Sequence, residues 1–273
     1  MISPNQPIGI FDSGIGGLTV AKAVMETLPD EHIVYVGDTA RVPYGIKSEE
    51  MVAKYALQIT DFLIQQQVKM ILIACNTVSA SAKQQIIERA GHIPVLDVIT
   101  SGTEAVFRNA THQQVGVIGT LATVHSRAYV QAIHEKDETV EVVQQACPLL
   151  VPLAEEGWLD NRIARLTLDE YLTVFKEHPI DSLILGCTHY PLFKDEIARW
   201  FNGNSVSIID SAESIAQSAK TLLQDQEALH KGEGSLRCFV TDRPQRFQEL
   251  AERFLGQPLQ HVEVVSLEEE RLD

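Results

Sequence analysis

Short β-rich runs alternate with segments of helical spacing along almost the whole chain. This alternation is typical of parallel strands joined by crossover helices, because a tight turn cannot link two parallel neighbours. We therefore expect an α/β fold built on open parallel sheets. The runs that predict strands are Ile8–Phe11, His32–Val36, Lys69–Ala74, Pro94–Val98, Val115–Ile118, Val140–Gln144, Ser182–Leu185, Val206–Ile209, Arg237–Val240 and His261–Val265.

Apolar residues mark one face of a helix in two segments between these runs. From Val52 to Leu63 they follow helical spacing, and Ser48 is suited to be the N-cap. A second helical face extends from Ala164 to Phe175. Each predicted helix leads directly into a strand that ends in a cysteine.

The two halves of the chain have the same internal pattern. Cys75 and Cys187 each end an apolar run and begin a polar triplet. The Gly-containing strands that start at Ile8 and Val115 are separated by nearly the same number of residues as the two cysteines. We interpret this as two similarly built units. The tail after residue 208 is short for a third domain, so we assign residues 1–98 and 209–273 to the first domain and residues 99–208 to the second.

The composition is that of an ordinary globular protein, with 45% hydrophobic and 22% charged residues among 273. A net charge of −15 argues against nucleic acid as the main partner, because binding to phosphate backbones relies on Lys and Arg. We see neither a secretory signal nor a membrane span, and expect a cytoplasmic location. The cysteines match neither a disulfide framework nor a standard zinc site, so we read Cys147 and Cys238 as buried apolar side chains.

Two further motifs follow strands at the edge where an open parallel sheet binds ligands. The turn from Asp12 to Gly17 opens a predicted helix, and its backbone N–H groups suit an anion, although its spacing is neither a dinucleotide nor a Walker motif. Asp12 itself could assist a base or a thiol. In the loop from Asp38 to Gly45, Tyr44 and the Gly45 amide could supply donors. Each motif alone is equally compatible with a purely structural turn.

Taken together, these motifs resemble the family of glutamate racemases. The matching segments are Asp12–Gly17, Pro43–Gly45, Cys75–Thr77 and Gly186–Pro191, in order over most of the chain. The resemblance implies two flavodoxin-like sandwiches with the active site between them. It also implies cofactor-independent interconversion of L- and D-glutamate, which supplies D-glutamate for peptidoglycan, without a metal, nucleic acid or membrane. A homodimer is compatible with it.

The resemblance also implies roles for individual residues. Cys75 and Cys187 would be the acid/base thiols, each favoured as thiolate by a following helix start, with Asp12 and His189 as their helpers. Glu155 matches an acidic position of the family, although an exposed loop carboxylate explains it equally well. The residues implied around the substrate are Asp12, Ser13, Tyr44, Gly45, Asn76, Thr77, Thr188 and His189.

Two other readings remain open at this stage. A related aspartate or hydantoin racemase would use the same two-cysteine logic, and its products would distinguish it. A small-molecule binding module would close on a ligand without chemistry, but it gives no reason for two thiols. A Cys187–His189 acyl-transfer pair leaves Cys75 unexplained.

Overall fold

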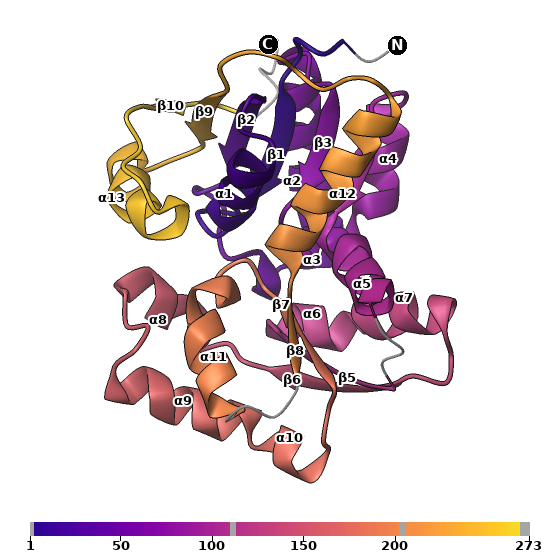
Figure 1. The fold of residues 1–273 in the computed structure, drawn as a ribbon. Coiled ribbons are helices and arrows are strands. Elements are labelled where there is room, and N and C mark those ends of the chain that lie inside the picture. Colours follow the sequence, from indigo (N-terminus) through magenta and orange to yellow (C-terminus); the bar gives the residue numbers. More distant parts are fainter. Residues whose placement is uncertain (1–2, 110–112, 202–205, 268–273) are drawn as a thin grey trace.

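The computed structural model describes residues 3–109, 113–201 and 206–267, and within them the strands form two separate parallel sheets. The larger sheet has the strand order β10-β9-β2-β1-β3-β4 and the smaller one β6-β5-β7-β8 (Figure 1). Every predicted strand overlaps one of these, so the α/β prediction is confirmed. The strands are β1 (Ile8–Asp12), β2 (His32–Gly37), β3 (Met70–Ile73), β4 (Val95–Asp97), β5 (Gln114–Gly119), β6 (Glu141–Ala146), β7 (Ser182–Gly186), β8 (Ser207–Asp210), β9 (Ser235–Val240) and β10 (Val262–Val264).

The helices lie between the strands, as crossover connections require. They are α1 (Leu18–Thr27), η1 (Tyr44–Ile46), α2 (Glu49–Gln65), α3 (Asn76–Ser81), α4 (Lys83–Ala90), α5 (Val98–Asn109), α6 (Leu121–Ser126), α7 (Ala128–Lys136), α8 (Leu150–Glu156), α9 (Arg162–Leu172), α10 (Val174–Glu177), η2 (Tyr190–Phe193), α11 (Lys194–Trp200), α12 (Ser211–Asp225) and α13 (Pro244–Leu255). In the described part of the chain, none of them has the length and apolar character needed to span a bilayer.

Both predicted helices exist, but the second one is interrupted. Ser48 caps α2 as expected, because its hydroxyl accepts a hydrogen bond from the Met51 amide at 3.3 Å. The segment from Ala164 to Phe175 is divided into α9 and α10 at Thr173. The hydroxyl of Thr173 donates to the Asp169 carbonyl at 2.7 Å, a local bond that bends helices.

Each sheet is covered by helices on both faces. On the larger sheet, α1, α12 and α13 bury one apolar layer, and α2, α3 and α4 bury the other. On the smaller sheet, α5 and α7 cover one face, and α8, α9 and α11 cover the other. Burial on both faces explains why strands such as β1 and β7 are apolar throughout rather than alternating.

The chain crosses between the two sheets twice, each time at a junction between a strand and a helix. It leaves the larger sheet from β4 into α5, where Asp97 Oδ1 accepts from the amides of Ile99 and Thr100, both at 3.0 Å. It returns from β8 into α12, where Asp210 Oδ1 accepts from the Ala212 amide at 2.8 Å. The helices α5 and α12 pack against each other. The domain division after residues 98 and 208 falls beside these junctions and stays a prediction.

Candidate active site

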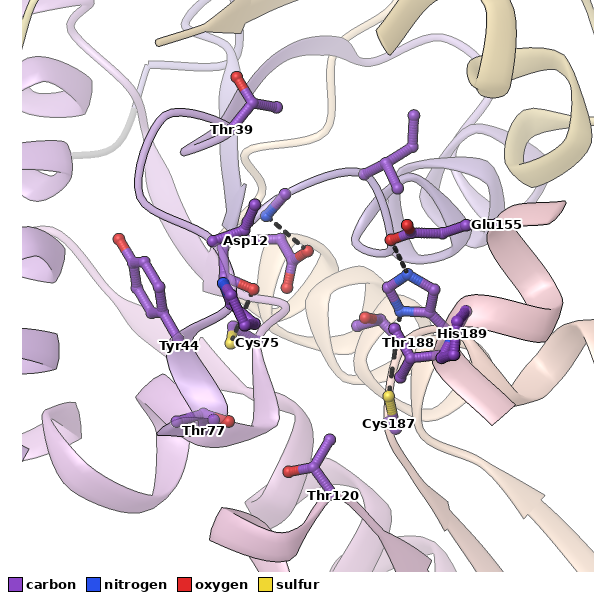
Figure 2. A pocket seen from close by; sticks show the side chains of 18 of the residues that line it. Asp12, Thr39, Tyr44, Cys75, Thr77, Thr120, Glu155, Cys187, Thr188 and His189 are labelled. Atoms are coloured by element: carbon purple, nitrogen blue, oxygen red, sulfur yellow. Dashed lines mark hydrogen bonds and ion pairs between the residues drawn. The ribbon is translucent and has the colours of Figure 1, made fainter. Parts of the chain in front are cut away.

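A cavity of about 710 Å³ lies where the carboxyl ends of strands from the two sheets meet. Figure 2 shows Cys75 on one wall, supplied by the larger sheet, and Cys187 on the opposite wall, supplied by the smaller one. The structure brings together every site residue predicted from the sequence. Those that line the cavity are Asp12, Ser13, Tyr44, Gly45, Cys75, Asn76, Thr77, Glu155, Cys187, Thr188 and His189.

Cys75 lies between the end of β3 and the first residue of α3, and only 5% of it is exposed. Its sulfur is 3.7 Å from the hydroxyl of Ser13. Burial, followed by the negative charge of Asp12, raises the pKa of the Cys75 thiol to about 12, although the amides of Val78 and Ser13 oppose the rise. The amide of Val78, in the first turn of α3, lowers this pKa as expected of a helix start, but the loss of water outweighs it and the net shift is upward.

The turn after β1 holds Asp12 in place. Its Oδ2 accepts from the amides of Gly14 and Gly17, both at 3.1 Å, so two of the N–H groups expected to face a ligand are used within the turn. The turn also lies directly against the other half, since a Cβ on Gly16 would stand 2.5 Å from His189 Nδ1. Glycine is therefore required there by a close approach of backbone to side chain.

Cys187 follows β7 and is 6% exposed. Its sulfur is 4.0 Å from Nδ1 of His189, and the other ring nitrogen, Nε2, lies 3.1 Å from Oε1 of Glu155. We expected a helix to start directly after Cys187. The structure has no helix there, and the next helical turn, η2, starts at Tyr190. Figure 2 shows the imidazole of His189 facing this thiol.

The electrostatics of this trio are those of an ion pair beside a sulfur. Burial lowers the pKa of His189, but hydrogen bonds and charges from Cys187 and Glu155 outweigh burial and raise the pKa to about 10. The hydrogen bond from His189 in turn lowers the pKa of Glu155, against the effect of its partial burial. The imidazole of His189 therefore lies as a cation between the carboxylate of Glu155 and the sulfur of Cys187.

Asn76 presents an unused donor at the cavity wall. Its Oδ1 accepts from the hydroxyl of Tyr129 at 2.8 Å, whereas its buried Nδ2 has no hydrogen-bond partner in the described part of the chain. A buried N–H without a partner is costly, and a ligand carboxylate would satisfy it.

Tyr44 lines the same cavity, but its hydroxyl proton is engaged elsewhere. The hydroxyl donates to Asp38, and in Figure 2 it is directed away from the sulfur of Cys75. Burial and the charge of Asp38 raise the pKa of Tyr44. The ring therefore shapes the wall, and the donor expected from this residue is committed to Asp38.

Several residues of the cavity wall were not predicted from the sequence. Thr120 follows β5 as Ser13 follows β1, so the internal repeat could have pointed to it. The start of α13 lines the cavity as well, but its apolar spacing is that of any core helix and carries no signal for a site. The residues that α13 and its N-cap contribute are Arg243, Arg246, Phe247 and Leu250.

This arrangement suits proton exchange at a carbon atom held between two sulfurs. One thiol can remove a proton from one face while the other supplies a proton to the opposite face. The hydroxyls and amides around the thiols can hold carboxylates. Among the residues described here, no cluster of three or more His, Cys, Asp or Glu side chains is arranged to hold a metal ion.

Comparisons with known proteins agree with this chemistry. Residues 17–219 match the model of the Asp/Glu/Hydantoin racemase family. A glutamate racemase from Chlorobaculum tepidum is 49% identical over 97% of this chain and 98% of its own length, and one from Syntrophus aciditrophicus is 52% identical over 96% and 97%. The crystal structure of glutamate racemase from Francisella tularensis in complex with D-glutamate superimposes with a TM-score of 0.90, at 46% identity over 97% of this chain and 98% of that one.

Proposed function

The chain belongs to the Asp/Glu/hydantoin racemase family, and on that premise we propose that it interconverts L- and D-glutamate by a two-thiol mechanism. The observation that carries the mechanism is the placement of Cys75 and Cys187 on opposite walls of one cavity. Glutamate is favoured over aspartate as substrate because the relatives that match over nearly the full chain are named glutamate racemases.

In the proposed reaction, one thiolate takes the Cα proton and the electron pair of the C–H bond stays on Cα. The resulting charge spreads onto the α-carboxylate, where hydrogen-bond donors stabilise it. The opposite thiol then gives its proton to the other face of Cα, which inverts the centre. A raised pKa keeps Cys75 protonated and ready to donate, and the cationic imidazole of His189 lies beside Cys187, the thiol proposed as the base in this direction. In the reverse direction the roles exchange.

We propose that the substrate carboxylates are held by neutral donors. The Nδ2 of Asn76 is the best placed, because it is already desolvated and has no hydrogen-bond partner among the residues that the structure describes. The hydroxyls of Ser13, Thr77, Thr120 and Thr188 line the same space and can donate without adding charge. Asp12 and His189 act beside the thiols, Asp12 toward Cys75 and His189 toward Cys187.

The cellular role follows from the proposed reaction. We propose a cytoplasmic enzyme that supplies D-glutamate for peptidoglycan, works without a cofactor, nucleic acid or membrane, and is compatible with a homodimer. A strain depleted of the protein is expected to stop growing and to recover when it takes up D-glutamate. Failure of D-glutamate to restore growth would contradict this role.

The decisive experiment replaces each thiol separately. Cys75→Ala and Cys187→Ala are each expected to reduce racemisation in both directions by well over a hundredfold, since one acid/base group contributes about 10²–10⁴. Cys238→Ala, a buried thiol in β9 outside the cavity, is the control and should retain activity. Near-normal turnover by either single variant would overturn the mechanism. Exchange of the Cα proton in deuterated water, with glutamate and aspartate compared, tests both the chemistry and the substrate.

A further inference from the structure

The C-terminal helix α13 reaches from the larger sheet to a helix of the smaller one. It packs against α1 through its apolar face, yet the guanidinium of Arg253 extends to the end of α8. There Nη1 donates to the carbonyl of Glu155 and approaches the carbonyl of Ala154 at 3.4 Å. In Figure 1, α8 and α13 lie across from each other on the same side of the molecule.

Arg253 acts as a cap supplied from another part of the chain. The last carbonyls of an α-helix have no partner within the helix, and a cation near them is also favoured by the helix dipole. Gly157, which ends α8 with φ +75°, leaves the space that this cap needs, because a Cβ there would lie 2.7 Å from Nη2 of Arg253. The guanidinium of Arg253 thus lies directly over the glycine that ends α8.

The residue whose carbonyl is capped is also the residue that holds the imidazole. Glu155 accepts from Arg253 through its backbone and contacts His189 Nε2 through its side chain at 3.1 Å. Its carboxylate is 41% exposed, and such an exposed ion pair contributes little when its chain segment is free to move. Fixing the backbone of Glu155 limits that movement and keeps the carboxylate on the ring.

The next residue of α13 supports the same imidazole from a second direction. Phe254 packs edge-on against the ring of His189, with centroids 5.2 Å apart. Two further charged or titratable groups act on the His189–Glu155 pair. Cys187 lies at Nδ1 of the ring, and Arg246 lies near Glu155.

We infer that Arg253 is a positioning residue for the Cys187 thiol, because it fixes Glu155 against His189 and so holds the imidazole toward the sulfur. The inference deepens the proposed function and rests on it. Among the described residues, Arg253 is not one of those that line the cavity: its side chain donates to two backbone carbonyls, and its effect passes through one carboxylate and one ring. If the contact between Arg253 and α8 had only a structural role, its loss would lower the stability of the fold but would leave the charge on His189 unchanged.

The test follows the titration of His189 by NMR in the full-length protein labelled at histidine, with His189→Asn used to assign the signal. Arg253→Ala is expected to lower the pKa of His189, as Glu155→Gln should, and the double variant should behave like Glu155→Gln alone. An unchanged titration in Arg253→Ala, or additive shifts in the double variant, would overturn the inference. This readout needs no turnover, so it stays informative if the proposed function fails.

Kinetics provide the second readout. We expect roughly a tenfold fall in kcat for Arg253→Ala, which is a small part of the about 10²–10⁴ that one acid/base group contributes. The fall in kcat should be larger in the direction in which Cys187 removes the proton. Because the equilibrium constant fixes the ratio of the two kcat/KM values, KM should shift in proportion to this imbalance. Arg253→Lys, which keeps the cation, should recover part of it and also serves if the alanine variant folds poorly. Glu252→Ala, on the exposed side of the same helix, is the matched control. Equal losses in both directions, or no rescue by lysine, would contradict positioning.

Discussion

Removing the hydroxyl of Tyr129 tests whether the amide of Asn76 is oriented for the substrate by its neighbour. Tyr129 is fully buried on α7, and its hydroxyl donates to Asn76 Oδ1 at 2.8 Å while lying 3.3 Å from the hydroxyl of Ser211. Phenylalanine fills nearly the same volume, so Tyr129→Phe deletes these contacts with little change in packing. The amide of Asn76 then loses the bond that keeps its Nδ2 free for a ligand.

Two magnitudes follow. Leaving a buried acceptor without a donor costs about 1–3 kcal/mol, so the free energy of unfolding should fall by that amount. In a chain of this size each kcal/mol corresponds to a shift in Tm of about 2–4 °C. A hydrogen bond to a charged carboxylate contributes about 1.5–3 kcal/mol, and a factor of ten in affinity is about 1.4 kcal/mol. Partial misorientation of the amide should therefore raise KM for both enantiomers up to about tenfold.

Tyr190→Phe provides the matched control. Tyr190 is equally buried, but its hydroxyl donates to the carbonyls of Gly119 and Cys147, at 2.9 and 2.8 Å, and to no residue proposed to bind substrate. Both variants should unfold at lower urea concentrations than the wild type, whereas only Tyr129→Phe should show a raised KM. If both variants raise KM equally, or if Tyr129→Phe is destabilised with KM unchanged, the orienting role of Tyr129 is refuted.

Three further outcomes are expected. Gly16→Ala should nearly abolish activity, because its Cβ would displace His189, and a variant with full kcat would show that this contact is dispensable. The pKa of His189 is raised from 6.5 to about 10, so its contribution to the free energy of unfolding is complete below about pH 6.5 and is lost as pH rises toward 10. Over this range the free energy of unfolding in urea should therefore decline more steeply for the wild type than for His189→Asn. Asp12→Asn and His189→Asn should change the two kcat values by unequal factors, and equal scaling in full kinetics of both directions would remove their assignment to separate thiols.

Most of the fold could be predicted because strands buried on both faces leave a direct mark on the sequence. The runs at β1 and β7, for example, are buried at every residue, and such a short continuous apolar run is distinct from the periodic spacing of a helix face. The break at Thr173 could not be predicted, since the apolar spacing continues across it and the same side-chain bond to the backbone, from Thr60 to the Ala56 carbonyl, leaves α2 unbroken.

The lining of the cavity could be predicted where polar residues follow the ends of strands, as at Cys75 and Cys187. It was not predictable where the wall comes from a distant helix, because the apolar spacing of α13 reflects packing against α1 and not the cavity that its first turn reaches. The raised pKa of Cys75 was also beyond the sequence, because burial is a property of the assembled fold and here exceeds the local effect of a helix start.

The two junctions between the sheets give the molecule a mechanical property. Two lobes joined by flexible linkers sample many relative orientations, and binding of a ligand between them costs the entropy of fixing one orientation. Here both connections are helices that begin directly at a strand end, anchored by Asp97 and Asp210, with α5 and α12 packed together. Changing the angle between the lobes requires strain at both anchors at once. The relative placement of the two sulfurs therefore depends on both junctions, and we expect a substitution at either anchor to displace one thiol with respect to the other.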